Sequence, residues 1–172
     1  MNYPRRLSSG ANNTVIVLSE TEVAKLFTGD TRSDIGSEAE KMKLANTVND
    51  LVPRFIRLDY DETLAAEMLV MERIMPIDYR AHEVERRELW FDVFADELAQ
   101  LHASGFVHRN LKRPSDLDGL AFDNILLTEH GLRLIDVGIS ALRNQVGDKI
   151  FAKYVEVEQG ELEQFRLYFL NR

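Results

Sequence analysis

The alternation of apolar and polar residues predicts a strand-rich beginning of the chain. TVIVL at 14–18 and VAKLF at 23–27 are short, mostly apolar runs with β-branched residues, which is typical of strands. The polar stretch SETE separates them, and TGDTRSDIGS follows as a loop rich in Gly, Ser and Asp. We therefore expect two neighbouring strands, the second of which carries Lys25 in its middle.

A helix and two more strands are expected next. Residues 38–51, EAEKMKLANTVNDL, are mostly good helix formers, and a proline two positions later would stop the helix. Ser37 is a candidate cap, with Glu40 three positions on, as in a capping box. The run at 55–74 predicts two strands around a turn at 59–62.

The pattern changes after residue 75. From 82 to 105 the large apolar residues recur every three or four positions, as on one face of a helix. They are Trp90, Phe94, Leu98 and Leu101. Gly105 favours the end of this helix. Two short apolar segments at 122–128 and 132–138 predict a hairpin, and 161–170 predicts a last helix.

The order of these elements predicts an α+β fold of two lobes. A small β-rich lobe with one helix would span 1–74, and a helical lobe with a hairpin would span 75–172, with a hinge near 72–77. The length of 172 residues fits one compact domain or two small lobes that share one ligand. Because ligands favour clefts between lobes, unusual polar residues near such a cleft are the candidates for function.

The composition narrows the classes of function. The chain is 45% hydrophobic and 29% charged, as in an ordinary globular protein. It has no cysteine, so disulfides, thiolate metal sites and cysteine nucleophiles are excluded, which fits a reducing compartment. The formal charge of −8 and the pI near 5.0 argue against nucleic acid as the main partner. No apolar run approaches the ~20 residues that span a bilayer, and no signal peptide is recognisable.

Lys25 is the first residue with unusual chemistry. A lysine centred in an apolar strand is costly unless its charge is paired. One interpretation is an edge-strand lysine whose stem reaches water. The other is an ion pair with an acid on the next helix, for which Glu38 is the candidate.

Polar residues near the predicted hairpin could hold a cation. Asp136 ends an apolar segment, and Asn124 precedes one. Strand-end acids and Asx turns often have local roles, yet carboxylate and amide oxygens also suit Mg²⁺, which usually keeps phosphate and water ligands as well. His108 is a lone histidine, for which a structural role is the commoner one. The turn that contains Gly10 could approach a phosphate with its backbone amides.

Taken together, these residues resemble the motif set of the protein kinase-like superfamily, in family order. Lys25 in VAK matches the strand lysine, and Glu38 matches the helix glutamate. HRNLK with Asn110 matches HRDLK, while DNILL with Asn124 and DVG with Asp136 match the two metal-binding motifs. MER, at 71–73, is similar to the hinge. The short chain is most similar to small atypical kinases of the RIO-like sort and to minimal bacterial effector kinases.

The resemblance implies a site for ATP and Mg²⁺, and a serine or threonine of a protein as phosphate acceptor. Lys25 would hold the α- and β-phosphates, Lys112 would steady the γ-phosphate, and Asn124 and Asp136 would bind Mg²⁺. The remaining nucleotide-binding residues would be Gly10, Val15, Val23, Glu38, Met71, Glu72, Ile74 and Leu126. The protein would act in the cytoplasm, or in a host cytosol if it is an effector.

Asn110 is the main departure from the family pattern. The family has an aspartate there, which accepts the proton of the substrate hydroxyl, and an amide cannot do so. General-base assistance is typically worth ~10²–10⁴-fold, whereas phosphoryl transfer depends mainly on positioning and electrostatics. Asn110 therefore predicts weakened catalysis. If it replaces a natural aspartate, an active kinase is expected instead.

Other departures concern the loops. Asn110 and Asn124 lie 14 positions apart, not five as in the family, and the inserted residues include Asp116 and Asp118. Either acid could substitute as a base or simply decorate a surface loop. With 36 residues after Asp136, no usual activation segment fits. Two of the three loop glycines are replaced, by Ser8 and Asn13.

Three functions remain open on these grounds. The first is a small ATP-dependent protein phosphotransferase. The second is a pseudokinase that binds nucleotide, or no ligand, and works through partner proteins. The third is a small-molecule kinase of the aminoglycoside phosphotransferase kind, which also uses an aspartate where this chain has Asn110. The encoded residue at this position and the response to ATP would separate them.

Overall fold

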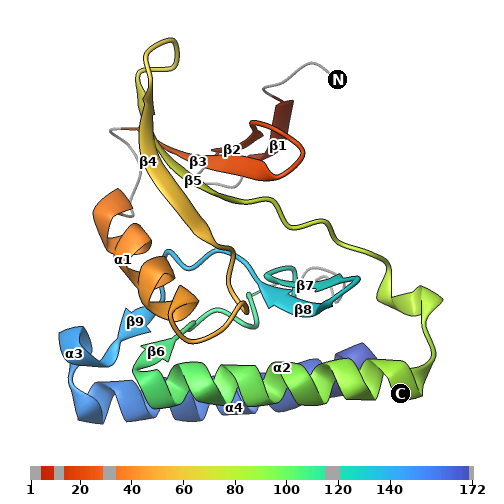
Figure 1. Cartoon of the computed structure of the whole chain (residues 1–172). Helices are drawn as coiled ribbons and strands as arrows, with labels where there is room; N and C mark the ends of the chain where they lie inside the picture. Colours follow the sequence, from red (N-terminus) through yellow and green to blue (C-terminus); the bar gives the residue numbers. More distant parts are fainter. Residues whose placement is uncertain (1–4, 10–13, 29–33, 115–120, 171–172) are drawn as a thin grey trace.

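The computed structural model describes residues 5–9, 14–28, 34–114 and 121–170. Its largest sheet has five strands, each antiparallel to its neighbours (Figure 1). In spatial order these are β1 (Arg5–Ser9), β2 (Thr14–Val17), β3 (Glu22–Phe27), β5 (Ala66–Glu72) and β4 (Phe55–Asp61). The sheet therefore places Lys25 on a central strand.

The strands differ from the sequence-based expectation in two places. β1 was not predicted, because RRLSS has only one apolar residue and gains its order from pairing with β2. The turn expected at 59–62 lies later, because β4 continues to Asp61. The bend includes Ala65, whose φ is 47°.

Helix α1 (Ile35–Asn46) begins and ends earlier than expected. Ser37 is not the cap: Asp34 is, and its carboxylate accepts the Ser37 N–H at 2.6 Å. An acid at this position also suits the helix dipole. After Asn46 the chain turns at residues 47–48, and Leu51 is then fully buried in the core.

Helix α2 (Val84–Ser104) matches the predicted apolar stripe. Phe94, Leu98 and Leu101 are buried, and Trp90 is partly buried. Gly105 ends the helix with a φ of 95°, a left-handed conformation that glycine adopts without strain. A short 3-10 turn, η1 (Tyr79–Ala81), precedes α2.

Helix α4 (Asp148–Leu170) is much longer than the helix expected at 161–170, and it lies alongside α2 (Figure 1). The predicted hairpin is present as β7 (Ile125–Thr128) and β8 (Gly131–Leu134). β6 (Phe106–Val107) pairs with β9 (Ala141–Leu142), and α3 (Arg143–Val146) leads into α4.

One hydrophobic cluster joins the sheet and α1 to the helical part. It includes Phe27 of β3, Met42 of α1, Leu101 of α2, Leu134 of β8 and Phe165 of α4. The other face of the sheet carries a smaller apolar cluster. Within the described ranges, no helix is long and apolar enough to cross a membrane. The division at residues 74 and 75 stays a prediction.

Candidate functional site

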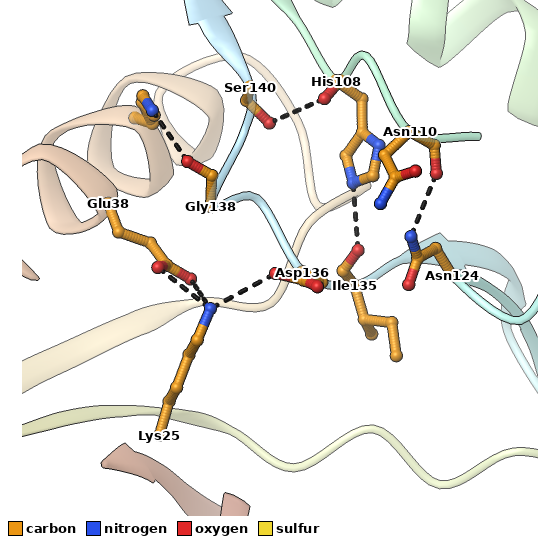
Figure 2. Close-up of polar contacts among 10 residues, drawn as sticks. Lys25, Glu38, His108, Asn110, Asn124, Ile135, Asp136, Gly138 and Ser140 are labelled. Atoms are coloured by element: carbon orange, nitrogen blue, oxygen red, sulfur yellow. Dashed lines mark hydrogen bonds and ion pairs between the residues drawn. The ribbon is translucent and has the colours of Figure 1, made fainter. Parts of the chain in front are cut away.

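Lys25 lies at the centre of a buried ion pair (Figure 2). Its Nζ lies 2.8 Å from Glu38 Oε1 and 3.0 Å from Oε2, although the two residues come from β3 and α1. Lys25 is only 4% exposed and Glu38 only 1% exposed. The interpretation of Lys25 as an edge-strand lysine is therefore wrong, because β3 is an interior strand and its ammonium is enclosed.

Asp136 completes this cluster from the other end of the chain. Its Oδ1 lies 3.2 Å from Lys25 Nζ, and about half of its side chain is exposed, at 49%. Its φ is 61°, which is uncommon for a residue with a side chain and often marks a functional position. The structure thus brings Asp136, which was singled out by itself in the sequence, next to Lys25 and its candidate partner Glu38.

The pKa values of the two carboxyl groups shift in opposite directions. Burial raises the pKa of Glu38, and the nearby Lys25 ammonium only partly offsets this. Burial also raises the pKa of Asp136, but here the charge and hydrogen bond of Lys25 outweigh it, so the pKa lies below its usual 3.8. Asp136 is therefore ionised at neutral pH, with part of its carboxylate open to a further cation.

The backbone of Ile135, directly before Asp136, is held on both sides, and Figure 2 shows the contact with His108. The Ile135 N–H donates to the Asn124 carbonyl at 2.9 Å, and the Ile135 carbonyl lies 2.9 Å from His108 Nε2. Because a carbonyl only accepts, the bond assigns the proton to Nε2 of His108. His108, which is fully buried, therefore has the structural role that is commoner for a lone histidine.

Asn124 is oriented by a second bond. Its Nδ2 donates to the Asn110 carbonyl at 3.0 Å, and the residue is 3% exposed. With its NH₂ group so engaged, its Oδ1 is the atom left to accept or to ligate. An oriented amide oxygen and an ionised carboxylate, linked through the Ile135 peptide, are a donor pair that fits Mg²⁺. Among the described residues, no group of three or more His, Cys, Asp or Glu side chains could hold a metal by itself.

Glu158 of α4 supports the loop that contains Asn110, and it was not among the residues predicted from the sequence. Its carboxylate is fully buried and accepts from the backbone N–H groups of His108 and Arg109 and from His102 Nε2, the last at 2.9 Å. The sequence contains an indication of this buried position, because residue 158 is seven positions from both Phe151 and Phe165 and so lies on the same helical face as these buried residues.

The described hydrogen bonds of Asn110 and Lys112 do not connect either residue directly to the ion cluster around Lys25. Asn110 is half-buried, and its carbonyl accepts from Asn124. Lys112 is exposed, and its Nζ donates to Gln164 Oε1 of α4 at 2.6 Å. The ends of the inserted segment meet where the Arg113 N–H donates to the Ala121 carbonyl at 2.7 Å.

Three predicted residues lie outside the described residues. These are Gly10, Asp116 and Asp118.

Several residues expected around adenine share the sheet face of Lys25. Val15 lies directly opposite Lys25, and Val23 lies opposite Met71. Directly opposed residues point to the same side of a sheet, so β2, β3 and β5 form one partly apolar wall beside the ammonium. Leu126 is half-buried on β7, and its place opposite this wall stays a prediction.

The expected hinge is tied to the rest of the molecule. The Glu72 N–H donates to the Arg54 carbonyl at 2.9 Å, and its carboxylate accepts from Arg133 Nη2 at 2.8 Å. Burial raises the pKa of Glu72, but the hydrogen bonds from Arg133 and from the Arg54 N–H outweigh it, and the pKa lies below 4.5. Ile74, which follows β5, makes no backbone hydrogen bond to a described residue.

A hollow of about 450 Å³ lies away from this cluster. Its lining residues are Leu44, Ser104, Gly105, Arg143, Asn144, Gly147 and Asp148. None of them belongs to the residues predicted for a nucleotide. The ion pairs around Lys25, and not this hollow, therefore form the candidate functional site.

Comparisons with known proteins support the fold class. No protein-family model matches the sequence, and no curated protein matches it. Among solved structures, the chain is similar to the kinase PK-1 of Cydia pomonella granulovirus, with a TM-score of 0.58 and 15% sequence identity. The match covers 80% of this chain and 51% of the viral kinase. The chain therefore has a kinase-like fold and spans about half the length of that kinase.

Proposed function

We propose that this protein is a two-lobed kinase-like domain, divided near residues 74 and 75, that binds ATP with Mg²⁺. One observation carries the proposal: Lys25 of β3 lies between Glu38 of α1 and Asp136, 2.8 Å from the first and 3.2 Å from the second. A buried ammonium needs acids beside it to offset its loss of hydration, and clusters of ionisable groups from distant parts of a chain are found more often at functional sites. The similarity to a viral kinase supports the same proposal.

In this proposal Asn124 and Asp136 hold the metal ion. When bound there, Mg²⁺ would supply positive charge that offsets the negative charge of the phosphates. Lys25 binds the α- and β-phosphates while Glu38 keeps its ammonium oriented. Val15, Val23 and Leu126 enclose the adenine, Met71 borders it, and the backbone of Glu72 and Ile74 binds its edge.

The reaction proposed is phosphate transfer to a serine or threonine of a protein, at a reduced rate. Asn110 would lie next to the acceptor hydroxyl but cannot take its proton. Lys112 would approach the γ-phosphate only after leaving Gln164. Positioning and electrostatics would then supply most of the catalysis.

The alternative is a pseudokinase that binds nucleotide and acts through a partner protein. Asn110 favours this alternative, because its amide cannot act as a base. Its backbone carbonyl accepts a hydrogen bond from the Asn124 amide, which provides no base either. Both functions predict ATP binding, and they differ in phosphate transfer.

The test compares the parent protein with Asn110→Asp in transfer of radiolabelled phosphate from ATP to a generic acceptor protein. Asn110→Asp is expected to raise the rate by about 10²-fold or more, and Asp136→Asn should abolish transfer in both backgrounds. Transfer that is absent from both proteins, with ATP binding intact, would favour the pseudokinase. Absence of Mg²⁺-dependent ATP binding would overturn both nucleotide-binding functions and leave only a pseudokinase scaffold that binds no nucleotide.

A further inference from the structure

The segment that follows Asp136 is held by two cations from different elements. Lys41 Nζ donates to the Gly138 carbonyl at 3.0 Å, and Arg109 Nη1 donates to the Ile139 carbonyl at 3.2 Å. Ser140 Oγ also donates to the His108 carbonyl at 3.2 Å. The turn is thereby fixed to α1 on one side and to the loop containing Asn110 on the other.

Lys41 is unusual among these contacts because it is buried. It is 9% exposed and lies one helical turn after Glu38, on the same face of α1. Burial lowers the pKa of Lys41, Arg109 and Lys25 lower it further, and Glu38 and Asp34 oppose this change. No carboxylate of the described residues lies within 4 Å of its Nζ, and its side-chain hydrogen bond within the described part of the chain is to the Gly138 carbonyl.

Gly138 connects Lys41 to the carboxylate of Asp136. A backbone hydrogen bond from Gly138 stabilises the ionised form of Asp136. A side chain at this position would lie 3.4 Å from Asp136 Oδ1, 3.4 Å from Glu38 Oε2 and 3.5 Å from Lys25 Nζ. The Cα of Gly138 therefore faces all three members of the ion cluster, and the absence of a side chain lets the turn lie close to them.

We propose that Lys41 is a positioning residue for Asp136: by holding the Gly138 carbonyl, it fixes the carboxylate beside Lys25 before any ligand binds. The part that concerns metal rests on the proposed function. Arg109 is the second anchor, and its guanidinium also lies over the Tyr154 ring at 4.0 Å. Both anchors donate to backbone carbonyl groups of this chain. The turn is therefore held without phosphorylation of any of its residues.

The test uses Lys41→Met, Lys41→Arg and a matched control, Lys43→Met, which changes an exposed lysine on the same helix. Hydrogen exchange of the peptide covering residues 136–142 is measured without nucleotide. Lys41→Met is expected to speed exchange of this peptide about tenfold, because a charge-assisted hydrogen bond is lost. Lys41→Arg should largely restore the parent rate, and Lys43→Met should not change it.

A second measurement separates positioning from simple support. Mg²⁺ should strengthen ATP binding to the parent and to Lys43→Met. In Lys41→Met this enhancement should be about tenfold smaller. The affinity of Lys41→Met for ATP in EDTA should equal that of the parent. Exchange equal to the parent, equal acceleration in Lys43→Met, or an unchanged Mg²⁺ enhancement would each overturn the proposal. If the parent binds no ATP, the proposed function fails, and the exchange result alone decides whether Lys41 fixes the turn.

Discussion

At the scale of single residues, Glu72 gives a test that depends on pH. Its pKa is lowered in the folded protein by Arg133 and by the Arg54 N–H, in spite of burial. A carboxyl group with a lowered folded pKa stabilises the protein above its unfolded pKa, near 4.5, and this stabilisation is lost as pH falls through the lower, folded value.

We therefore expect Glu72→Gln to be less stable than the parent at pH 7 and to lose less stability below pH 4.5. Urea unfolding at a series of pH values measures this difference. Glu67→Gln, on the same strand and exposed, is the control. Parallel stability curves for parent and Glu72→Gln would show that the Arg133 pair does not form.

The residues of the ion cluster are easier to predict from the sequence than the residues that hold it. Lys25 was conspicuous because it interrupts an apolar strand, and Glu38 and Asp136 followed from motif order. Lys41 and Glu158 were missed because a charged residue on a helix is usually solvated, although Glu158 shares a helical face with Phe151 and Phe165; the packing shows that both charged residues are buried.

At the scale of secondary-structure elements, α4 is a structural support for the loop that carries Asn110. The Glu158 carboxylate accepts three donors, two of them backbone N–H groups of that loop. An amide has one accepting oxygen, so Glu158→Gln would leave buried donors unsatisfied at a cost of about 1–3 kcal/mol each.

We expect Glu158→Gln to lower the free energy of unfolding by about 2 kcal/mol or more and to speed hydrogen exchange at His108 and Arg109. Glu156→Gln, exposed on the same helix, should leave both unchanged. Chemical denaturation and exchange measured on the same samples test this. A stability equal to that of the control would mean that α4 does not support the loop through Glu158.

Element boundaries were predicted unevenly. α2 was predicted well, because its apolar stripe is continuous and Gly105 ends it with a left-handed conformation. α4 was predicted only from 161, because Gly160 and two valines, Val155 and Val157, lower the local helix propensity. The packing of Phe151, Glu158 and Phe165 stabilises the helix across this weak stretch.

At the scale of the whole molecule, the fold brings together residues that are remote in sequence. Lys25 and Asp136 are separated by 111 positions, yet they form one ion pair. Only a fold that returns the chain to the sheet after the hairpin can do this, and motif order anticipated it. The distances, the exposed half of Asp136 and the anchoring of its turn follow from packing, which no pattern of residues specifies.

The most direct test of the proposed metal and nucleotide site is diffraction at the manganese edge from crystals grown with Mn²⁺ and a non-hydrolysable ATP analogue. We expect an anomalous peak within coordination distance, about 2.1 Å, of Asn124 Oδ1 and an Asp136 carboxylate oxygen, with phosphate oxygens facing Lys25 Nζ. An ordered analogue bound elsewhere, or bound here without metal between Asn124 and Asp136, would contradict the proposed site.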